Sequence, residues 1–351
     1  MFNNLRCNSF VYKSAKIKMK NCILGIESTA HTFGIAIYDA RKKKFLANLK
    51  SAYTTESGGI IPIESAKHHE KNKDNLFKEA LEKAKISENE IKAIAFSQGP
   101  GLAPCLLVGL RFAKQLAKKL NVPIVPVNHC IAHLEIGKIT GAKNPVLLYC
   151  SGANTQIISY AAGKYRIFGE TLDIGIGNFI DNFAREIGIG FPGGPKIAEL
   201  AKNKNAKYVE LPYSIKGMDV AFSGLLTNLQ QKYKSGKFSK EDLSYSLQET
   251  AFAMLLEAAE RALAHLGKKE LLLGGGVACN TRLQEMATIM CKERGAKLFV
   301  PVNEFLVDNA GMIAYLGAKM LGAGIKFSEK DAEDLDIKPR ERTDDVLVKW
   351  K

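Results

Sequence analysis

The strongest constraint on the fold of this 351-residue chain is a pattern that occurs twice. Residues 22–50 read as an apolar strand, a small polar turn, a second strand, a charged turn and a third strand. Residues 146–170 repeat that order, and alternating helical and strand segments follow each unit. Two β-β-β units, each followed by α/β elements, predict an internal duplication and an α/β architecture.

Hydrophobic spacing predicts the elements around the two units. Short apolar runs predict a strand at 124–127 and buried strands within "AIAFSQGPG", "ELLLGGG" and "KLFVPV". Helical spacing is expected at 65–85, 104–120, 177–187, 196–202, 240–265, from Asn280 onward, and at 309–321.

Composition narrows the function classes without selecting one. A net charge of +14 permits an acidic partner such as RNA. The seven cysteines form no CxxC pair, which indicates reduced thiols and a cytoplasmic protein rather than a disulfide framework or zinc knuckle. No apolar run reaches the roughly 20 residues of a membrane span. Residues 1–20 are basic and lack acids, and we expect a flexible extension there.

Two small polar turns lie at corresponding places in the repeated units. They are "ESTAHT" at 27–32 and "SGANTQ" at 151–156, and a glycine loop, "LLGGGVACN", follows at 272–280. Small residues let backbone N–H groups approach a phosphate. Hairpin turns need small residues in any case, but three such loops favour a nucleotide held between two lobes.

His129 and His133 follow an apolar run and stand four positions apart. On a helix they share one face and can offer two imidazoles to one metal ion, although capping or core histidines show the same spacing. The metalloprotease motif HExxH does not fit, because Cys130, Ile131 and Ala132 stand between them.

As an ordered set, the motifs resemble one family. The set comprises "GIESTAHTFGIAI", "SQGPGLAPCLLVGLRFAKQLA", "VNHCIAHLEIG", "SGANTQ", "GNFIDNFAREIG", "FPGGPKI", "DVAFSGL", "GGGVACNTRL" and "DNAGMIAYLG". It is similar to the universal tRNA threonylcarbamoyladenosine (t6A) transferases, the catalytic subunits of the archaeal and eukaryotic KEOPS complex. The resemblance runs from about Cys22 to Leu321.

The resemblance implies a duplicated actin/Hsp70/sugar-kinase-like (ASKHA) fold with a nucleotide cleft between two lobes. We expect the lobes at 21–144 and 145–325, after the extension 1–20 and before a basic tail at 326–351. The implied reaction moves the threonylcarbamoyl group from threonylcarbamoyl-AMP to N6 of adenosine 37 in tRNAs that read ANN codons, releasing AMP.

The resemblance also implies site residues. One divalent metal per subunit, Fe²⁺ or Zn²⁺, would be bound by His129, His133 and Asp308, with Tyr149 binding or approaching it. Glu27 ends the first strand and is an acid/base or orienting candidate, although a hairpin-turn glutamate is the simpler interpretation. The expected nucleotide contacts are Ser151, Gly152, Asn154 and Thr155 at the phosphates, Asp181 and Gly194 at the ribose, and Asn280 near the adenine.

The sequence departs from the family pattern in places. Ala153 replaces a glycine, which is tolerable only if φ stays negative there. Ala198 replaces a glutamate that approaches the ribose, and Glu199 stands beside it. His68 and His69 remain on an amphipathic helix, which by the resemblance helps to bind partner subunits and to shape the entrance to the site. The simpler expectation for both is a solvated helical face.

The expected partners are tRNA and further KEOPS subunits: a small kinase/ATPase on a separate chain, a Pcc-type dimerisation subunit and a regulatory subunit. Phosphate contacts need only a positive surface. Basic residues crowd at 13–20, 41–44, 67–73 and 338–342. Two alternatives stay open, a sugar or acid kinase of the same superfold and a non-catalytic tRNA-binding scaffold.

Overall fold

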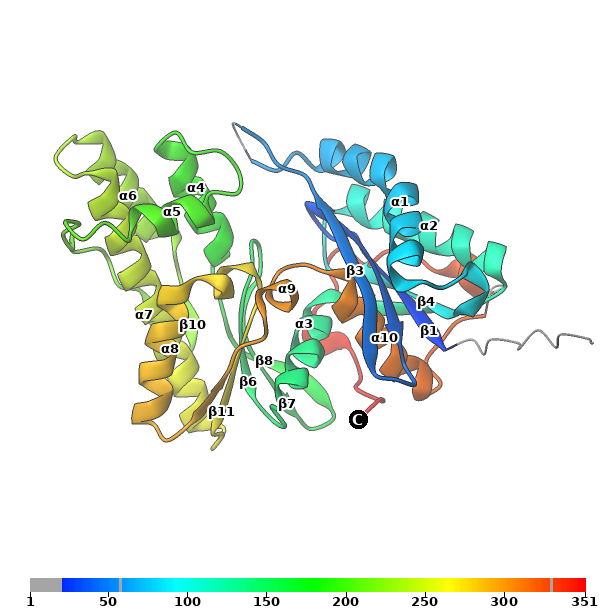
Figure 1. Cartoon of the computed structure of the whole chain (residues 1–351). Helices are drawn as coiled ribbons and strands as arrows, with labels where there is room; N and C mark the ends of the chain where they lie inside the picture. The colour runs from blue at the N-terminus through cyan, green and yellow to red at the C-terminus, as the bar shows by residue number, and fades with distance from the viewer. Residues whose placement is uncertain (1–20, 57–58, 329–330) are drawn as a thin grey trace, which may run out of the picture.

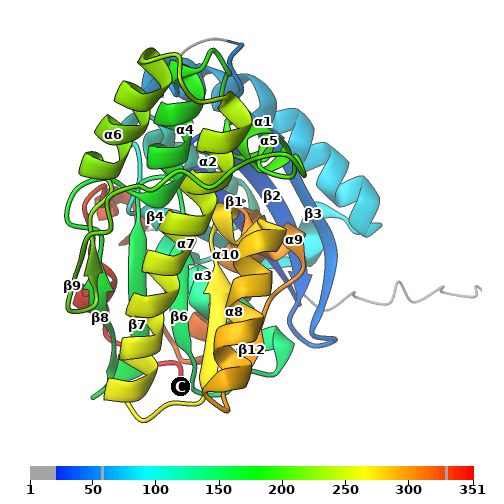
Figure 2. The same ribbon diagram turned by 90° about the vertical axis from the view of Figure 1, so that its left-hand side faces the viewer.

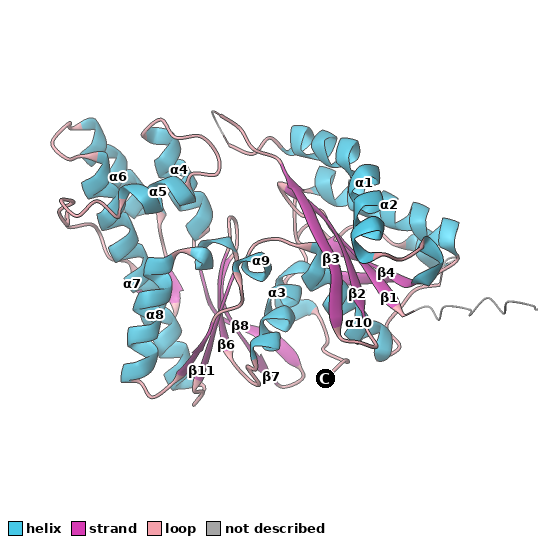
Figure 3. Cartoon of the chain, viewed as in Figure 1, coloured by secondary structure: helices cyan, strands magenta, loops and turns pink. Residues whose placement is uncertain are grey.

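The computed structural model describes residues 21–56, 59–328 and 331–351 and contains two five-stranded sheets flanked by helices (Figures 1 and 3). The predicted extension 1–20 lies outside the described residues. No helix in the described ranges combines the length and apolar character needed to cross a bilayer.

The first sheet has the strand order β3-β2-β1-β4-β5. Strands β1, β2 and β3 form an antiparallel meander, and β4 and β5 extend the sheet in parallel with β1. Their bounds are Cys22–Glu27, Thr32–Asp39, Lys44–Ala52, Ile91–Gly99 and Ile124–Asn128. Helices α1 (Pro62–Ala84) and α2 (Ala103–Leu120) pack against this sheet and against each other.

The second sheet repeats the first. Its order is β12-β11-β6-β7-β8, so the meander β6-β7-β8 corresponds to β1-β2-β3 and the parallel strands β11 and β12 to β4 and β5. The bounds are Val146–Cys150, Thr155–Ala161, Lys164–Glu170, Glu270–Gly274 and Lys297–Phe299. The predicted internal duplication is therefore confirmed in the sheet topology.

Helices of the second half cover one side of the second sheet in Figure 2. Of these, α7 (Lys240–His265) and α8 (Thr281–Glu293) contact the strands, whereas α4 (Ile176–Glu186), α5 (Gly194–Leu200) and α6 (Ser223–Lys234) pack on one another and on α7. The sequence did not predict α6 or the small hairpin formed by β9 (Ile215–Lys216) and β10 (Asp219–Val220).

Two helices join the halves. Helix α3 (His129–Gly137) lies between the sheets in Figure 1 and contacts β5 and β11. After the short helix α9 (Asn303–Leu306), α10 (Ala310–Gly322) packs not on the second sheet but on β1, β2 and β4 of the first. A Cβ on Gly25 of β1 would lie 2.3 Å from the carbonyl oxygen of Ala310, so this contact requires glycine. The chain thus returns to its first sheet through the segment that carries Asp308.

Candidate active site

The two predicted metal-binding histidines stand at the start of α3. Strand β5 ends at Asn128, whose side-chain oxygen accepts a hydrogen bond from the Ile131 N–H at 3.1 Å and caps the helix. His129 is the first helical residue, and His133 follows one turn later. Their rings are 4.9 Å apart between centroids, and both residues are buried, at 5% and 2% exposure.

Asp308 completes the group from the turn between α9 and α10. Its Oδ1 lies 3.4 Å from Nε2 of His129 and 3.4 Å from Nε2 of His133. One donor atom from each of the three residues lies within 4.8 Å of the others, which is close enough for one ion to be shared. The geometry therefore brings together the three residues that the sequence assigned to a metal.

Tyr149 lies beside this group at the end of β6. Its ring centroid is 5.0 Å from that of His133. The Tyr149 hydroxyl is fully buried and makes no hydrogen bond within the described residues. A buried polar atom without a partner is costly unless something binds it. Two imidazoles, a carboxylate and an unpartnered phenol fit a divalent transition metal such as Fe²⁺ or Zn²⁺.

Glu27 supports the group from β1. This carboxylate has no exposed surface, and its Oε2 is 3.0 Å from Nδ1 of His129. The other oxygen accepts hydrogen bonds from the Thr29 N–H at 2.7 Å and the Thr29 hydroxyl at 2.6 Å. A carboxylate on the second ring nitrogen orients a metal-binding histidine and leaves Nε2 for the ion. Of the two candidate roles of Glu27, the contacts favour the orienting one.

Electrostatics couple these side chains. Burial alone would lower the pKa of His129, but the carboxylates of Glu27 and Asp308 outweigh it and hold that pKa well above its usual range. Burial and the neighbouring His129 lower the pKa of His133. Burial would raise the pKa of Asp308, yet the two imidazoles hold it well below its usual range. A concentrated, mutually dependent charge group of this kind is typical of a functional site.

The "SGANT" turn between β6 and β7 holds the start of α4. The Ile176 N–H donates to the Thr155 hydroxyl at 2.8 Å, and the N–H groups of Gly177 and Asn178 donate to carbonyls of the same turn. Thr155 is 2% exposed, and its hydroxyl caps this helix.

The exposed part of the turn consists of Gly152 and Ala153. Neither N–H group takes part in a hydrogen bond within the described part of the chain. Ser151 and Asn154 close the turn, since the Ser151 N–H donates to the Asn154 carbonyl at 2.9 Å. Ala153 is not among the residues with positive φ, so the missing glycine costs no backbone strain. The available phosphate donors are therefore backbone N–H groups.

The predicted ribose residues lie together at the start of α5. Asp181 of α4 accepts a hydrogen bond from the Gly193 N–H at 2.8 Å, directly before Gly194. Burial raises the pKa of Asp181. On the facing side, His31 packs edge-on against Phe191 with centroids 5.3 Å apart. The two halves of the chain thus meet beside Asp181.

Asn280 has structural contacts that the sequence did not suggest. Its side-chain oxygen accepts from the N–H groups of Arg282 at 2.9 Å and Leu283 at 3.4 Å, and its amide nitrogen donates to Gln248. It is the N-cap of α8, and an adenine contact stays a prediction. The preceding Gly275 has φ +87°, and a Cβ there would lie 2.3 Å from the Cys150 carbonyl oxygen.

The expectation of a solvated face at His68 and His69 is wrong for His69. His69 is fully buried, and its Nε2 lies 2.9 Å from the Ala30 carbonyl oxygen, which also accepts from the Ser65 hydroxyl at 2.8 Å. Burial lowers the pKa of His69 to about 4, so the ring is neutral and donates to Ala30. His69 and Ser65 thus anchor the turn that follows Glu27.

Sequence reasoning missed two supporting residues. Asn128 caps α3, and Thr29 fixes the Glu27 carboxylate. The position of Asn128, immediately before the helix that carries both histidines, was a usable signal because asparagine is a preferred N-cap. No local pattern marks Thr29.

Comparisons with known proteins agree with this geometry. The family model of the tRNA N6-adenosine threonylcarbamoyltransferases, TsaD, matches residues 44–315. A Thermococcus kodakarensis protein of that name is 56% identical over 327 residues, which cover 93% of this chain and 99% of the relative. One from Thermofilum pendens is 48% identical over 330 residues, covering 94% and 97%.

A Methanosarcina mazei protein named "Probable bifunctional tRNA threonylcarbamoyladenosine biosynthesis protein" is 52% identical over 335 residues, 94% of this chain and 60% of that protein. Solved structures show the fold alone. Full-length HypF has a TM-score of 0.58 at 13% identity, covering 87% of this chain and 56% of HypF. The activator of the 2-hydroxyisocaproyl-CoA dehydratase from Clostridium difficile has a TM-score of 0.53 at 11% identity, covering 87% and 98%.

These likenesses confirm the predicted ASKHA fold. The family match covers most of the chain and includes His129, His133 and Tyr149, and Asp308 lies within it too. The chain belongs to the tRNA N6-adenosine threonylcarbamoyltransferase family.

Proposed function

We propose that this protein transfers the threonylcarbamoyl group from threonylcarbamoyl-AMP to N6 of adenosine 37 in ANN-decoding tRNAs, forming t6A and releasing AMP. The carrying observation is the buried group of His129, His133 and Asp308, which lies where segments of both halves converge in a member of this family. In this assignment the chain is an N6-L-threonylcarbamoyladenine synthase.

One divalent ion, Fe²⁺ or Zn²⁺, would be held by His129, His133 and Asp308, with the Tyr149 hydroxyl beside it. Such an ion supplies Lewis acidity, which polarises a carbonyl or neutralises a phosphate. Glu27 holds the Nδ1–H of His129 and so aims Nε2 at the ion position. The near-complete burial of both histidines keeps bulk water from the reacting centre, where water would compete with the adenosine amine for the acyl group.

The chain's other contributions are to bind and orient the adenylate. The free N–H groups of Gly152 and Ala153 are suited to an anionic phosphate. Asp181 and Gly194 are assigned to the ribose, and Asn280 lies on the loop assigned to the adenine. Thr155 supports the phosphate loop through its cap on α4.

A kinase of the same superfold is the weaker candidate. A sugar or acid kinase works with Mg²⁺, a hard ion that prefers oxygen ligands. The group of His129, His133 and Asp308 instead offers two imidazole nitrogens beside one carboxylate. This donor set supports the transferase, and metal analysis of the purified protein distinguishes the two.

The proposed partners are tRNA and the KEOPS subunits, namely a small kinase/ATPase, a Pcc-type dimerisation subunit and a regulatory subunit, in the cytoplasm. The name of the Methanosarcina relative describes a bifunctional protein, and two-fifths of its length lies outside the match to this chain.

The test is nucleoside mass spectrometry on an unmodified ANN-decoding tRNA. The tRNA is incubated with the purified protein, freshly made threonylcarbamoyl-AMP and the proposed partner subunits. We expect a threonylcarbamoyladenosine peak that is lost in His129→Ala and kept in His265→Ala, a histidine control at the exposed end of α7. No peak with any partner combination, from folded and metal-loaded protein, would refute the assignment and favour the scaffold.

A further inference from the structure

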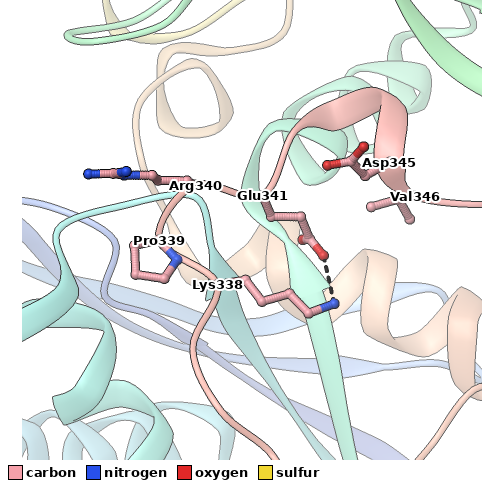
Figure 4. A pocket seen from close by; sticks show the side chains of 6 residues that line it. All are labelled: Lys338, Pro339, Arg340, Glu341, Asp345 and Val346. Carbon is pink, nitrogen blue, oxygen red and sulfur yellow. Dashed lines mark hydrogen bonds and ion pairs between the residues drawn. The ribbon is translucent and has the colours of Figure 1, made fainter.

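The C-terminal tail carries a basic run at 338–342, and Lys338 and Arg342 of this run form ion pairs within the protein. Lys338 pairs with Glu341, the dashed line in Figure 4, and the two atoms are 3.0 Å apart. Arg342 pairs with Asp344 at 3.0 Å and with Glu170 at 3.4 Å. Lys338 and Arg342 remain about half exposed, and Arg340 is exposed, so the run keeps a cationic surface while two of its side chains are paired. The contacts of this tail also point to a role inside the molecule.

The tail is fixed to the first half of the chain by backbone contacts. The Lys338 N–H donates to the Gln98 carbonyl at 2.8 Å, and the Gly101 N–H donates to the Pro339 carbonyl at 3.1 Å. A Cβ on Gly99 would lie 1.9 Å from the Lys338 carbonyl oxygen, so only glycine admits the tail at this distance. The approach is therefore built into the "SQGPG" turn after β4.

The same tail continues onto the second half. The Thr343 hydroxyl is 3.5 Å from the side-chain oxygen of Gln156 on β7, and Thr343 is 2% exposed. Further along, Leu347 forms an isolated antiparallel β-bridge with Lys164 of β8, and the Val348 N–H donates to the Gly163 carbonyl at 3.2 Å. Residues 338–348 thus contact both halves.

Between these contacts, Glu341 reaches the cap of α3. Its side chain is 10% exposed, and its Oε2 accepts from the Asn128 amide nitrogen at 3.0 Å. The amide oxygen of Asn128 faces the Ile131 N–H. If the amide were flipped, its NH₂ would face the Ile131 N–H and its oxygen would face a carboxylate, so both contacts would be repulsive. Glu341 therefore selects the orientation in which Asn128 caps the helix.

We propose that Glu341 is a positioning residue for the metal centre, acting through Asn128 on the first turn of α3 and hence on His129. Helix α3 has nine residues and carries both histidines, so fraying of its first turn moves His129 relative to His133 and Asp308. This inference rests on the proposed metal centre.

The test measures Co²⁺ binding by its visible absorption, in competition with a chromophoric chelator, on folded full-length protein. Substitutions in the supporting shell of a metal site cost roughly 10–100-fold in affinity. We expect Glu341→Ala to lose about tenfold and to change the Co²⁺ spectrum, and Glu341→Gln, which keeps an acceptor for Asn128, to stay close to the unmodified protein. Glu333→Ala, an exposed glutamate on the same tail, is the matched control.

Exchanging the amide of Asn128 and the carboxylate of Glu341 distinguishes a positioning effect on the metal centre from a general loss of stability. Asn128→Asp keeps a capping oxygen but sets a carboxylate against Glu341, so Co²⁺ affinity should fall. The double variant N128D/E341Q restores one donor and one acceptor and should recover most of that affinity. No recovery, or normal Co²⁺ affinity in Glu341→Ala, would overturn the positioning role. If the unmodified protein bound no Co²⁺, or His129→Ala bound it equally well, the metal centre itself would be refuted.

Discussion

Replacing Glu27 by glutamine should weaken metal binding although the two side chains have almost the same size. One carboxylate oxygen of Glu27 accepts two hydrogen bonds from Thr29, and the other faces Nδ1 of His129 at 3.0 Å. A glutamine amide has only one acceptor oxygen. If that oxygen serves Thr29, the NH₂ group faces His129 and favours the tautomer with the proton on Nε2, the nitrogen that the metal needs. If the amide flips, its NH₂ group opposes the Thr29 N–H.

The magnitude follows from the loss of one orienting contact. Outer partners of metal-binding histidines are worth roughly 10–100-fold in affinity. Each tenfold step is 1.36 kcal/mol, so the expected loss is about 1.4 to 2.7 kcal/mol. Full burial of the Glu27 carboxylate argues for the upper half of this range, because water cannot replace the missing acceptor.

The assay is competitive titration with Zn²⁺ and a chromophoric chelator, with circular dichroism to verify folding. Glu64→Gln is the control, because this glutamate is exposed on α1 and pairs with Lys67 on the same helix. We expect the control to match the unmodified protein. Zn²⁺ affinity of Glu27→Gln within twofold of the unmodified protein would refute the orienting role assigned to this carboxylate.

Three further predictions concern stability. Burial would raise the pKa of Glu135, but Lys138 and Lys319 lower it to about 2. The ionised Glu135 therefore adds at most about 3 kcal/mol to the free energy of unfolding above pH 4.5, and this contribution is lost as the pH falls towards 2. In urea unfolding, Glu135→Gln should be less stable than the unmodified protein at pH 7, and the difference should disappear in acid. Burial lowers the pKa of His69 to about 4, so the free energy of unfolding should fall by up to about 3 kcal/mol as the pH drops from 6.5 to 4. His69→Gln should reduce the dependence of Tm on pH in this range, and an unchanged dependence would contradict a buried, neutral His69. Gly275→Ala should lower Tm and AMP binding together, because the new methyl group meets the Cys150 carbonyl oxygen at 2.3 Å; normal AMP binding would disprove this.

Much of the fold could be predicted because each repeated unit is local in sequence. The strand predicted at 22–26 is observed at Cys22–Glu27, and the long helix predicted at 240–265 has those limits. The partner sheet of α10 could not be predicted. The apolar and small residues of α10 predict a buried helix but do not indicate which sheet it packs on. Its contact with Gly25 joins residues that are far apart in the sequence.

Of the site residues, too, some could be predicted from the sequence and others could not. Histidines at i and i+4 share a helix face by geometry alone, so the pair at 129 and 133 could be predicted together. Thr155 and Asn280 could not be assigned, because hydroxyls and amides serve ligands and helix caps equally well. In both residues the structure shows the cap. His69 was assigned to a solvated face because the sequence gives no sign of the Ala30 carbonyl that it meets.

The return of α10 to the first sheet has a consequence for the order of synthesis. Strands β1, β2 and β4 are made early, yet the helix that covers one of their faces ends at Gly322. On the ribosome, one apolar face of the first sheet therefore remains uncovered until α10 has emerged. Asp308 enters with that same final segment. The nascent chain consequently lacks one of the three residues proposed to hold the metal until Asp308 has been synthesised.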